Sequence, residues 1–298
     1  MSAIPANTVD VRVTGPVVAL ESTLILHGVP RDSARGLAHE LDEIVRAEGG
    51  VPAMIAIVRG RAVVGVRDDE LDELLAAPKV AKANTSNIGV LMHRGDHGAT
   101  TVSATMEVAA SAGIRVFATG GLGGVHRGYG QHLDISADLC AFTRFPVAVV
   151  TSGVKSLLDV ESTREAFEAL GVTVVGLRTE RFPAFYLRES GAKVDASFAD
   201  ERDLAAFARR EMDRTGRGIV VCNPIPPEYE LGRSEWEAWL AAAEREAEAV
   251  GVRGRDVTPF VLSKLHGLSG GKTLRANLAL VRSNAAAAGR LARWMTSL

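Results

Sequence analysis

The sequence has few cysteines, little net charge and no long apolar run. Its 298 residues include only Cys140 and Cys222, which are too distant along the chain to indicate a disulfide framework or a zinc-ligand cluster. We expect both to be small residues in or near the core. The formal net charge is −2, so the composition predicts no nucleic-acid partner, although a local basic pocket for one phosphate stays open.

No uncharged apolar segment is long enough to span a bilayer, so no membrane partner is expected. The first residues, MSAIPANTVD, lack the basic and apolar regions of a secretion signal, and a cytoplasmic location is expected. Hydrophobic residues make up 47% and charged residues 23%, as in ordinary globular proteins. Because no repeat or linker divides the chain, we predict a single domain over residues 1–298.

Short apolar segments alternate with Ala-rich amphipathic ones. Several of the apolar segments are continuous, which is typical of strands covered on both faces. The predicted strands are Val17–Leu20, Met54–Val58, Ala62–Val64, Val116–Ala118, Val147–Thr151, Val172–Leu177 and Gly218–Cys222. The predicted helices are Arg31–Glu48, Asp69–Ala77, Thr101–Ala112, Val154–Leu170, Asp200–Thr215, Arg233–Val250, Thr258–Leu268 and Leu274–Met295. This alternation predicts an α/β fold, a three-layer α/β/α sandwich around a mostly parallel or mixed central sheet.

Two neighbouring segments contain residues that can bind an anion. A glycine cluster follows the predicted strand Val116–Ala118, and it consists of Gly120, Gly121, Gly123, Gly124 and Gly128. Glycines let backbone N–H groups approach a phosphate, but a tight turn for packing is an equal alternative. Thr101 and Ser103 open a predicted helix, where hydroxyls and free N–H groups form either an anion site or a plain helix cap.

Three acids and one lysine are candidates for the chemistry. Asp134 and Asp138 have a spacing that can bring two carboxylates to one Mg²⁺ or Mn²⁺ ion, although such acids are more often surface groups. Lys155 lies near the start of a predicted helix, where the dipole disfavours an ammonium group and favours a nucleophilic amine. An exposed surface lysine is the alternative. Glu21 ends a predicted strand, where it is a candidate general acid or a turn cap.

Taken in order, these segments resemble the pseudouridine-5′-phosphate glycosidases, also called the indigoidine synthase A-like family. The resemblance covers nearly the whole chain. Matching segments include VALESTLILHGVPR (18–31), HGATTVSATM (97–106), GIRVFATGGLGGVHRG (113–128), DISADL (134–139), VAVVTSGVKSLLD (147–159), VVGLRTERFPAFY (174–186) and LRANLALVRSNAAAA (274–288). Each segment is a weak signal alone, but their combination in this order is highly specific.

The resemblance implies reversible cleavage of the C–C glycosidic bond of pseudouridine 5′-phosphate to uracil and ribose 5-phosphate. It implies that Lys155 attacks the sugar C1′ and forms an imine, and that Glu21 is the proton donor. Asp134 matches the ligand of one divalent ion, Mn²⁺ or alternatively Mg²⁺. The matched substrate-binding positions are Lys82, Thr101, Val102, Ser103, His126, Ser136, Ala137, Asp138 and Asn277. The resemblance also implies a homotrimer.

One segment departs from the family pattern. The family reads close to S-R-R-D-L after its lysine, whereas Lys82 is followed by ANTSNI. Two arginines that can hold a phosphate are absent there, and His93, Arg94 and His97 are candidate replacements. Two alternatives therefore stay open: the same lysine and metal chemistry on another modified nucleotide or C-glycoside phosphate, and a non-catalytic sugar-phosphate-binding protein.

Overall fold

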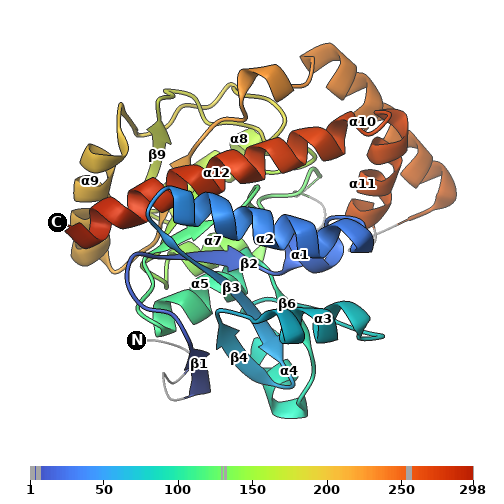
Figure 1. Ribbon diagram of the computed structural model, residues 1–298. Helices are drawn as coiled ribbons and strands as arrows, with labels where there is room; N and C mark the ends of the chain where they lie inside the picture. Colours follow the sequence, from blue (N-terminus) through green and yellow to red (C-terminus); the bar gives the residue numbers. More distant parts are fainter. Residues whose placement is uncertain (1–3, 5–7, 129, 131–132, 253–256, 298) are drawn as a thin grey trace.

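The computed structural model describes the chain except residues 1–3, 5–7, 129, 131–132, 253–256 and 298, and it shows a sheet between two layers of helices (Figure 1). The 11 strands of this sheet are β1 Val9–Val11, β2 Val17–Glu21, β3 Val51–Val58, β4 Arg61–Val64, β5 Ala81–Ala83, β6 Gly98–Thr100, β7 Val116–Ala118, β8 Ala148–Thr151, β9 Val174–Leu177, β10 Ala196–Phe198 and β11 Ile219–Cys222. Their order is β1-β4-β3-β2-β7-β8-β11-β9-β10, with β6 beside β3 and β5 beside β6. Among these strands only β3–β4 and β3–β6 pair antiparallel, which confirms the predicted α/β class with a mixed sheet.

The helices cover both faces of the sheet. They are α1 Thr23–His27, α2 Arg31–Ala47, α3 Asp68–Ala76, α4 Ile88–Arg94, α5 Val102–Ser111, α7 Ala137–Phe142, α8 Val160–Ala169, α9 Glu201–Thr215, α10 Arg233–Val250, α11 Val257–Leu268 and α12 Lys272–Ser297. Val18 and Leu20 of β2 pack in one core with α2, α9 and α12, whereas Ala19 packs in the other with α5, α7 and α8. Alternate residues of a strand therefore meet opposite helix layers, which explains the continuous apolar runs. Figure 1 shows α2 and α12 crossing the sheet side by side.

The predicted elements agree with the structure where the apolar pattern is long. Each of the seven predicted strands overlaps an observed one. The strands without a prediction, β1, β5, β6 and β10, have three residues each. The helices α1, α4 and α7 have five to seven residues and also had no prediction. Segments this short carry too few residues to show a period; the equally short β7 was predicted because its three residues are all apolar.

The predicted helix Val154–Leu170 is wrong over its first six residues, because α8 begins at Val160. Asp159 caps this helix, and its carboxylate accepts a hydrogen bond from the Ser162 N–H at 2.9 Å. The preceding loop is bound to another loop instead, since the Lys155 N–H donates to the Leu122 carbonyl oxygen at 3.1 Å. The helix-dipole argument for the Lys155 amine therefore fails.

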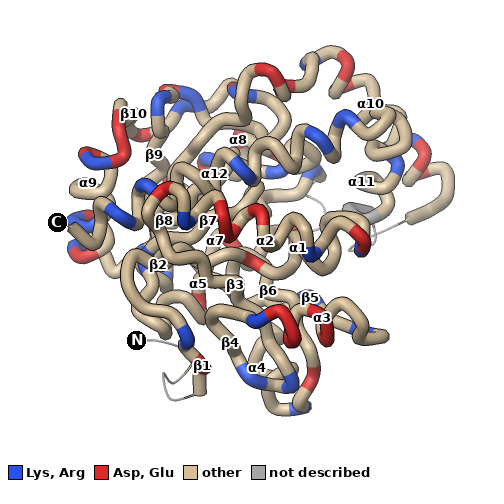
Figure 2. The backbone as a smooth tube through the Cα atoms, in the orientation of Figure 1, with Lys and Arg blue, Asp and Glu red and all other residues tan. Residues whose placement is uncertain are grey.

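Three expectations from the composition can be compared with the structure: the burial of the cysteines, the membrane-spanning helices and the distribution of charge. Cys222 is buried in the sheet as expected, whereas Cys140 is exposed on α7, so the core prediction for it is wrong. Within the described ranges, no helix has the length and apolar character that crossing a membrane requires. Figure 2 shows acidic and basic residues interspersed along the chain, in keeping with its small net charge.

Candidate active site

A cavity of about 510 Å³ lies where β2, β7 and β8 end. Among the residues that line it are four of the predicted site residues: Glu21, Lys82, Lys155 and Asn277. These positions are distant in the sequence, so the fold brings them together. The volume is ordinary for a site that encloses a small organic molecule. Helices α1, α11 and α12 contribute His27, His266 and Thr273 to its walls.

Two short strands bring Lys82 to the same cavity as Glu21. Glu21 is the last residue of β2, and the turn after it is bound to β6. The Thr100 N–H donates to Ser22 Oγ at 2.9 Å, and the Thr23 hydroxyl donates to the Thr100 carbonyl oxygen at 2.8 Å. Strand β5 pairs with β6, with Lys82 opposite Ala99. The geometry of the acid and this lysine thus depends on β5 and β6.

The environment of Glu21 favours the protonated acid. Burial raises the pKa of this carboxyl above its usual value, and the negative charge of Asp138 adds to the rise. Lys155, a hydrogen bond donated by the Thr119 hydroxyl, and Lys82 oppose the rise in that order, without reversing it. A carboxyl group whose pKa is raised beside two lysines is suited to general-acid chemistry.

The environment of Lys82 favours the neutral amine. Partial burial in the cavity lowers the pKa of Lys82, the positive charge of Lys155 lowers it further, and Glu21 opposes both effects. Lys155 therefore acts on the titration of both Glu21 and Lys82. The three groups share one electrostatic environment, as an acid, an amine and a charge partner in one reaction site do.

The loop that carries Lys155 is held from both sides. The Leu158 N–H donates to the Lys155 carbonyl oxygen at 2.9 Å, which closes a turn at the lysine. The next residue, Ser156, donates its hydroxyl to the Ala184 carbonyl oxygen and accepts a hydrogen bond from the Tyr186 N–H at 3.2 Å. These bonds fix the backbone beside the cavity that Lys155 lines.

A second group of predicted residues surrounds Asp138 at the N-terminus of α5. The buried Asp138 carboxylate accepts hydrogen bonds from the Ser103 N–H at 3.0 Å and the Gly123 N–H at 2.8 Å. The Ser136 hydroxyl caps α7, accepting from the Asp138 N–H at 3.2 Å. Thr101 begins α5 without a side-chain capping bond, and its hydroxyl lies 3.3 Å from that of Ser103. Val102 is buried and Ala137 begins α7. None of the residues in this group around Asp138 lines the described cavity.

Asp134 lies apart from Asp138. Asp134 is exposed, and its Oδ2 is 3.8 Å from Nδ1 of His126. The His126 N–H donates to the Asp134 carbonyl oxygen at 3.0 Å, so a backbone hydrogen bond holds the two residues together. Across the part of the chain that the structure describes, no group of three His, Cys, Asp or Glu side chains is placed to hold a metal. Among the described residues, Asp134 is thus an exposed carboxylate with His126 beside it.

The glycine cluster serves close packing. A Cβ on Gly121 would lie 2.6 Å from Cε2 of Phe185, and a Cβ on Gly124 would lie 2.8 Å from Cγ2 of Thr163. A Cβ on Gly123 would lie 2.7 Å from the Asp138 carboxylate, which this residue's N–H binds. The packing alternative is therefore confirmed at these glycines, and the anion that Gly123 holds belongs to the protein itself.

A buried polar network behind the cavity had no sequence prediction. The Asn284 amide donates to the Thr119 carbonyl oxygen at 2.8 Å, and its Oδ1 accepts from Nδ2 of Asn223 at 2.9 Å. Asn284 is fully buried on α12. The only signal for it in the sequence is one polar residue in the apolar stripe of a helix. His27, His266, Tyr186 and Trp236 line the cavity without such a signal.

The segment that departs from the family pattern forms a turn closed by its own side chains. Asn84 Oδ1 accepts from the Ser86 N–H at 2.9 Å, and the Asn84 N–H donates to Asn87 Oδ1 at 2.8 Å. The Thr85 N–H lies 3.5 Å from Ser103 Oγ, so this turn adjoins the N-terminus of α5. The candidate replacements for the missing arginines do not line the described cavity, and His97 lies 3.4 Å from Glu73 instead.

The fold and the cavity together define an α/β protein with an acid and two lysines at the carboxyl edge of its sheet. Residues 9–294 match the family model described as indigoidine synthase A like protein. The chain belongs to this family. The resemblance seen in the sequence is thereby confirmed.

Curated relatives and solved structures extend the match over almost the whole chain. A protein of Caldanaerobacter subterraneus named pseudouridine-5′-phosphate glycosidase is 46% identical over 95% of this chain and 92% of its own. A protein of Methylobacterium nodulans with the same name is 48% identical over 93% of this chain and 82% of its own. Prealnumycin C-glycosynthase in complex with ribulose 5-phosphate superposes with a TM-score of 0.92 at 33% identity, with 98% of each chain covered. An indigoidine synthase A-like protein of Thermotoga maritima gives a TM-score of 0.87 at 38% identity, with 95% of each chain covered.

Proposed function

We propose that this enzyme cleaves the C–C glycosidic bond of pseudouridine 5′-phosphate reversibly, giving uracil and ribose 5-phosphate. The observation that carries the proposal is one cavity lined by Glu21, Lys82 and Lys155, in which burial raises the pKa of the Glu21 carboxyl. The names of the curated relatives support the same substrate. A leaving carbon needs a proton on the base, which is the role that a protonated Glu21 fits.

The reaction begins at the sugar C1′. The Lys155 amine forms a bond to C1′ while the C1′–O4′ bond breaks, and O4′ takes the proton that the nitrogen loses, so the ribose ring opens and the nitrogen regains its lone pair. Glu21 then supplies a proton to C5 of the base, the carbon that carries the sugar. The C1′–C5 bond breaks as its electrons re-form the C5–C6 double bond and the nitrogen lone pair forms the imine. Water hydrolyses the imine, which releases ribose 5-phosphate and restores the Lys155 amine.

Lys82 and Asn277 bind the substrate in this proposal, and both line the cavity. Thr101, Val102 and Ser103, around the start of α5, hold the phosphate end. The further substrate-binding positions are His126, Ser136, Ala137 and Asp138. Hydroxyls and backbone N–H groups at a helix N-terminus can bind a phosphate even where no arginine is present. The Thr85 N–H adjoins this group, which supports neutral groups as the phosphate ligands of this chain.

One divalent ion, Mn²⁺ or Mg²⁺, fits Asp134. A single exposed carboxylate beside His126 suits an ion that keeps most of its water ligands, because both ions prefer oxygen. The ion supplies positive charge that neutralises substrate oxygens. Homotrimeric assembly and a cytoplasmic location stay predictions of the resemblance and the composition.

Release of uracil from pseudouridine 5′-phosphate, with and without Mn²⁺, tests the proposal. The wild-type chain should release uracil, and Lys155→Ala should release none while its thermal unfolding is unchanged. Borohydride reduction with ribose 5-phosphate should trap an adduct on Lys155 of the wild type. Normal turnover by Lys155→Ala would overturn the mechanism, and a missing adduct together with no turnover would favour a binding protein.

A second candidate is the same chemistry on another modified nucleotide or C-glycoside phosphate. The ANTSNI segment beside the start of α5 favours it, as does the structural similarity to prealnumycin C-glycosynthase. A panel of nucleoside and C-glycoside phosphates separates the two candidates. If the second candidate is right, pseudouridine 5′-phosphate should be a poor substrate, with kcat/KM well below that of the best compound in the panel.

A further inference from the structure

Phe185 is held in a backbone conformation that bulky residues rarely adopt. Its φ is +61°, in the left-handed region. Among the described residues, three other non-glycine residues have a positive φ, Arg59, Leu133 and Arg178, and none of them lines the cavity that Phe185 lines. Such a conformation has a free-energy cost, so it persists only where the surroundings determine it, and it is frequent at functional sites.

The surroundings of Phe185 enforce this conformation. The Phe185 N–H donates to the Ser152 carbonyl oxygen at 2.9 Å, and Ala184 bridges to Gly153. Gly153 itself has a φ of +84°, and a Cβ there would lie 2.6 Å from the carbonyl carbon of Pro183. The segment before Phe185 is thus packed directly against the loop that leads to the catalytic lysine.

The result of this conformation is an aromatic ring placed against Gly121 at the cavity. A Cβ on Gly121 would collide with the ring, so the missing side chain makes room for it. The ring is edge-to-face with Tyr186, with centroids 4.7 Å apart, and Tyr186 lies 5.1 Å from Trp236. These three rings are at most 7% exposed, yet all of them line the cavity. They form an aromatic wall beside Lys155.

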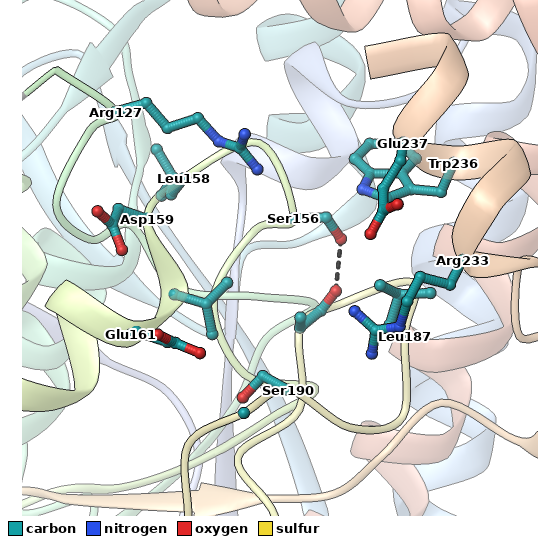
Figure 3. A pocket seen from close by; sticks show the side chains of 13 residues that line it. Arg127, Ser156, Leu158, Asp159, Glu161, Leu187, Ser190, Arg233, Trp236 and Glu237 are labelled. Carbon is teal, nitrogen blue, oxygen red and sulfur yellow. Dashed lines mark hydrogen bonds between the residues drawn. The ribbon is translucent and has the colours of Figure 1, made fainter. Parts of the chain in front are cut away.

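The other side of this wall is unlike the reaction cavity. Trp236 and Ser156 also line a second cavity of about 350 Å³, shown in Figure 3. Arg127, Arg233 and Glu161 are among the residues that line it, so its lining carries charges of both signs. Charged groups of both signs suit a neutral, planar base poorly. Phe185 and Tyr186 line the reaction cavity, as Lys155 does, and do not line this second one.

We propose that the Phe185 ring is the platform on which the uracil base stacks during the reaction. This inference rests on the proposed function and adds the residue that selects the base. A nucleobase has two apolar faces, and stacking on an aromatic ring covers one of them. The strained backbone holds the platform at a fixed position, so the base presents C5 to the acid. Phe185 thereby favours a planar, unsaturated base over a saturated one.

Phe185→Leu tests the platform, because leucine keeps the apolar bulk and removes the ring. The KM for pseudouridine 5′-phosphate should rise at least about fivefold, as expected for the loss of a stacked base. Wild type should bind uracil more tightly than 5,6-dihydrouracil, whose ring is not planar, and the variant should lose that preference. Imine trapping with ribose 5-phosphate should continue at the wild-type rate, since that sugar carries no base.

Phe198→Leu is the matched control, because this residue pairs with Phe207 at 5.1 Å and does not line the cavity. It should leave all three measurements unchanged. Equal losses of imine trapping and base binding in Phe185→Leu would show a purely structural role and overturn the proposal. An unchanged preference for uracil would also overturn it. If wild type forms no imine and releases no uracil, the proposed function itself fails, which is a different result.

Discussion

The hydroxyl of Thr119 donates a hydrogen bond to the carboxylate of Glu21. Thr119 is buried directly after β7, and its own carbonyl oxygen is bound by Asn284 of α12 at 2.8 Å. A chain of hydrogen bonds thus runs from the C-terminal helix to the proposed proton donor. It fixes the orientation of the acid at the end of β2, and it gives Glu21 a stabilising partner for its charged form.

Thr119→Val tests this hydrogen bond with a side chain of similar shape. The bond lowers the pKa of Glu21, so its loss should raise that pKa further. Because the general acid acts in its protonated form, the high-pH limb of the kcat profile should move to higher pH, and kcat should fall roughly tenfold as the acid loses its orientation. Thr143→Val, which removes a hydroxyl that binds the Cys140 carbonyl oxygen away from the cavity, is the control. An unmoved limb would contradict the prediction.

Glu21→Gln should abolish activity and stabilise the fold at neutral pH. The pKa of Glu21 in the folded protein lies above its ordinary value of 4.5 because the group is buried. The contribution of this acid to stability is therefore complete below pH 4.5 and is lost as pH rises through the folded-state pKa. Thermal unfolding of Glu21→Gln should occur at a higher temperature than wild type at pH 7, and the difference should shrink near pH 4. A difference of the opposite sign would refute this account.

Asn284→Leu should weaken both the fold and the site. It leaves the buried Thr119 carbonyl oxygen without its donor, which costs about 1–3 kcal/mol in the free energy of unfolding. It should also lower kcat, because the Thr119 backbone helps to orient Glu21. Urea unfolding and kinetics of the double variant with Thr119→Val are the measurement. The loss of activity in the double variant should be smaller than the sum of the two single losses. Full additivity would show that the two residues act independently.

Gly121→Ala should destabilise the protein because its Cβ would lie 2.6 Å from the Phe185 ring. Overpacking of this kind costs about 1–3 kcal/mol, and displacement of the ring should raise KM as well. Gly36→Ala is the matched control, since a Cβ there meets nothing within 4 Å inside α2. This second change should stabilise the fold by about 0.5–1 kcal/mol. Equal unfolding midpoints for the two variants would refute the packing role.

Asp134→Asn should weaken the binding of Mn²⁺ by an order of magnitude or more, because the amide removes the charge that attracts the ion. Calorimetric titration of Mn²⁺ in the presence of ribose 5-phosphate measures the affinity directly. Asp96→Asn, an exposed aspartate outside the cavity, should leave it unchanged. If Asp134→Asn bound Mn²⁺ as tightly as wild type does, a group other than Asp134 would be the ligand of the ion.

The predictable parts of this protein are those in which local pattern and structure coincide. Strands such as Val147–Thr151 are covered on both faces, so they form nearly continuous apolar segments in the sequence. The helix that ends before Gly171 was predictable because that residue adopts a φ of +65°. The start of the same helix was not, since Asp159 and the loop from Lys155 are bound to a neighbouring loop. At that start, hydrogen bonds to a loop distant in the sequence outweigh the local helix preference.

The sequence by itself determined the α/β class, because periodicity is a local property, and through the family resemblance it named the candidate reactive groups. Only the tertiary structure decided that Glu21, Lys82 and Lys155 share one cavity, and that burial shifts the pKa of the first two. It also decided that Gly121 makes room for the Phe185 ring. These relationships join residues from separate elements, and their proximity arises only when two helix layers close on the sheet.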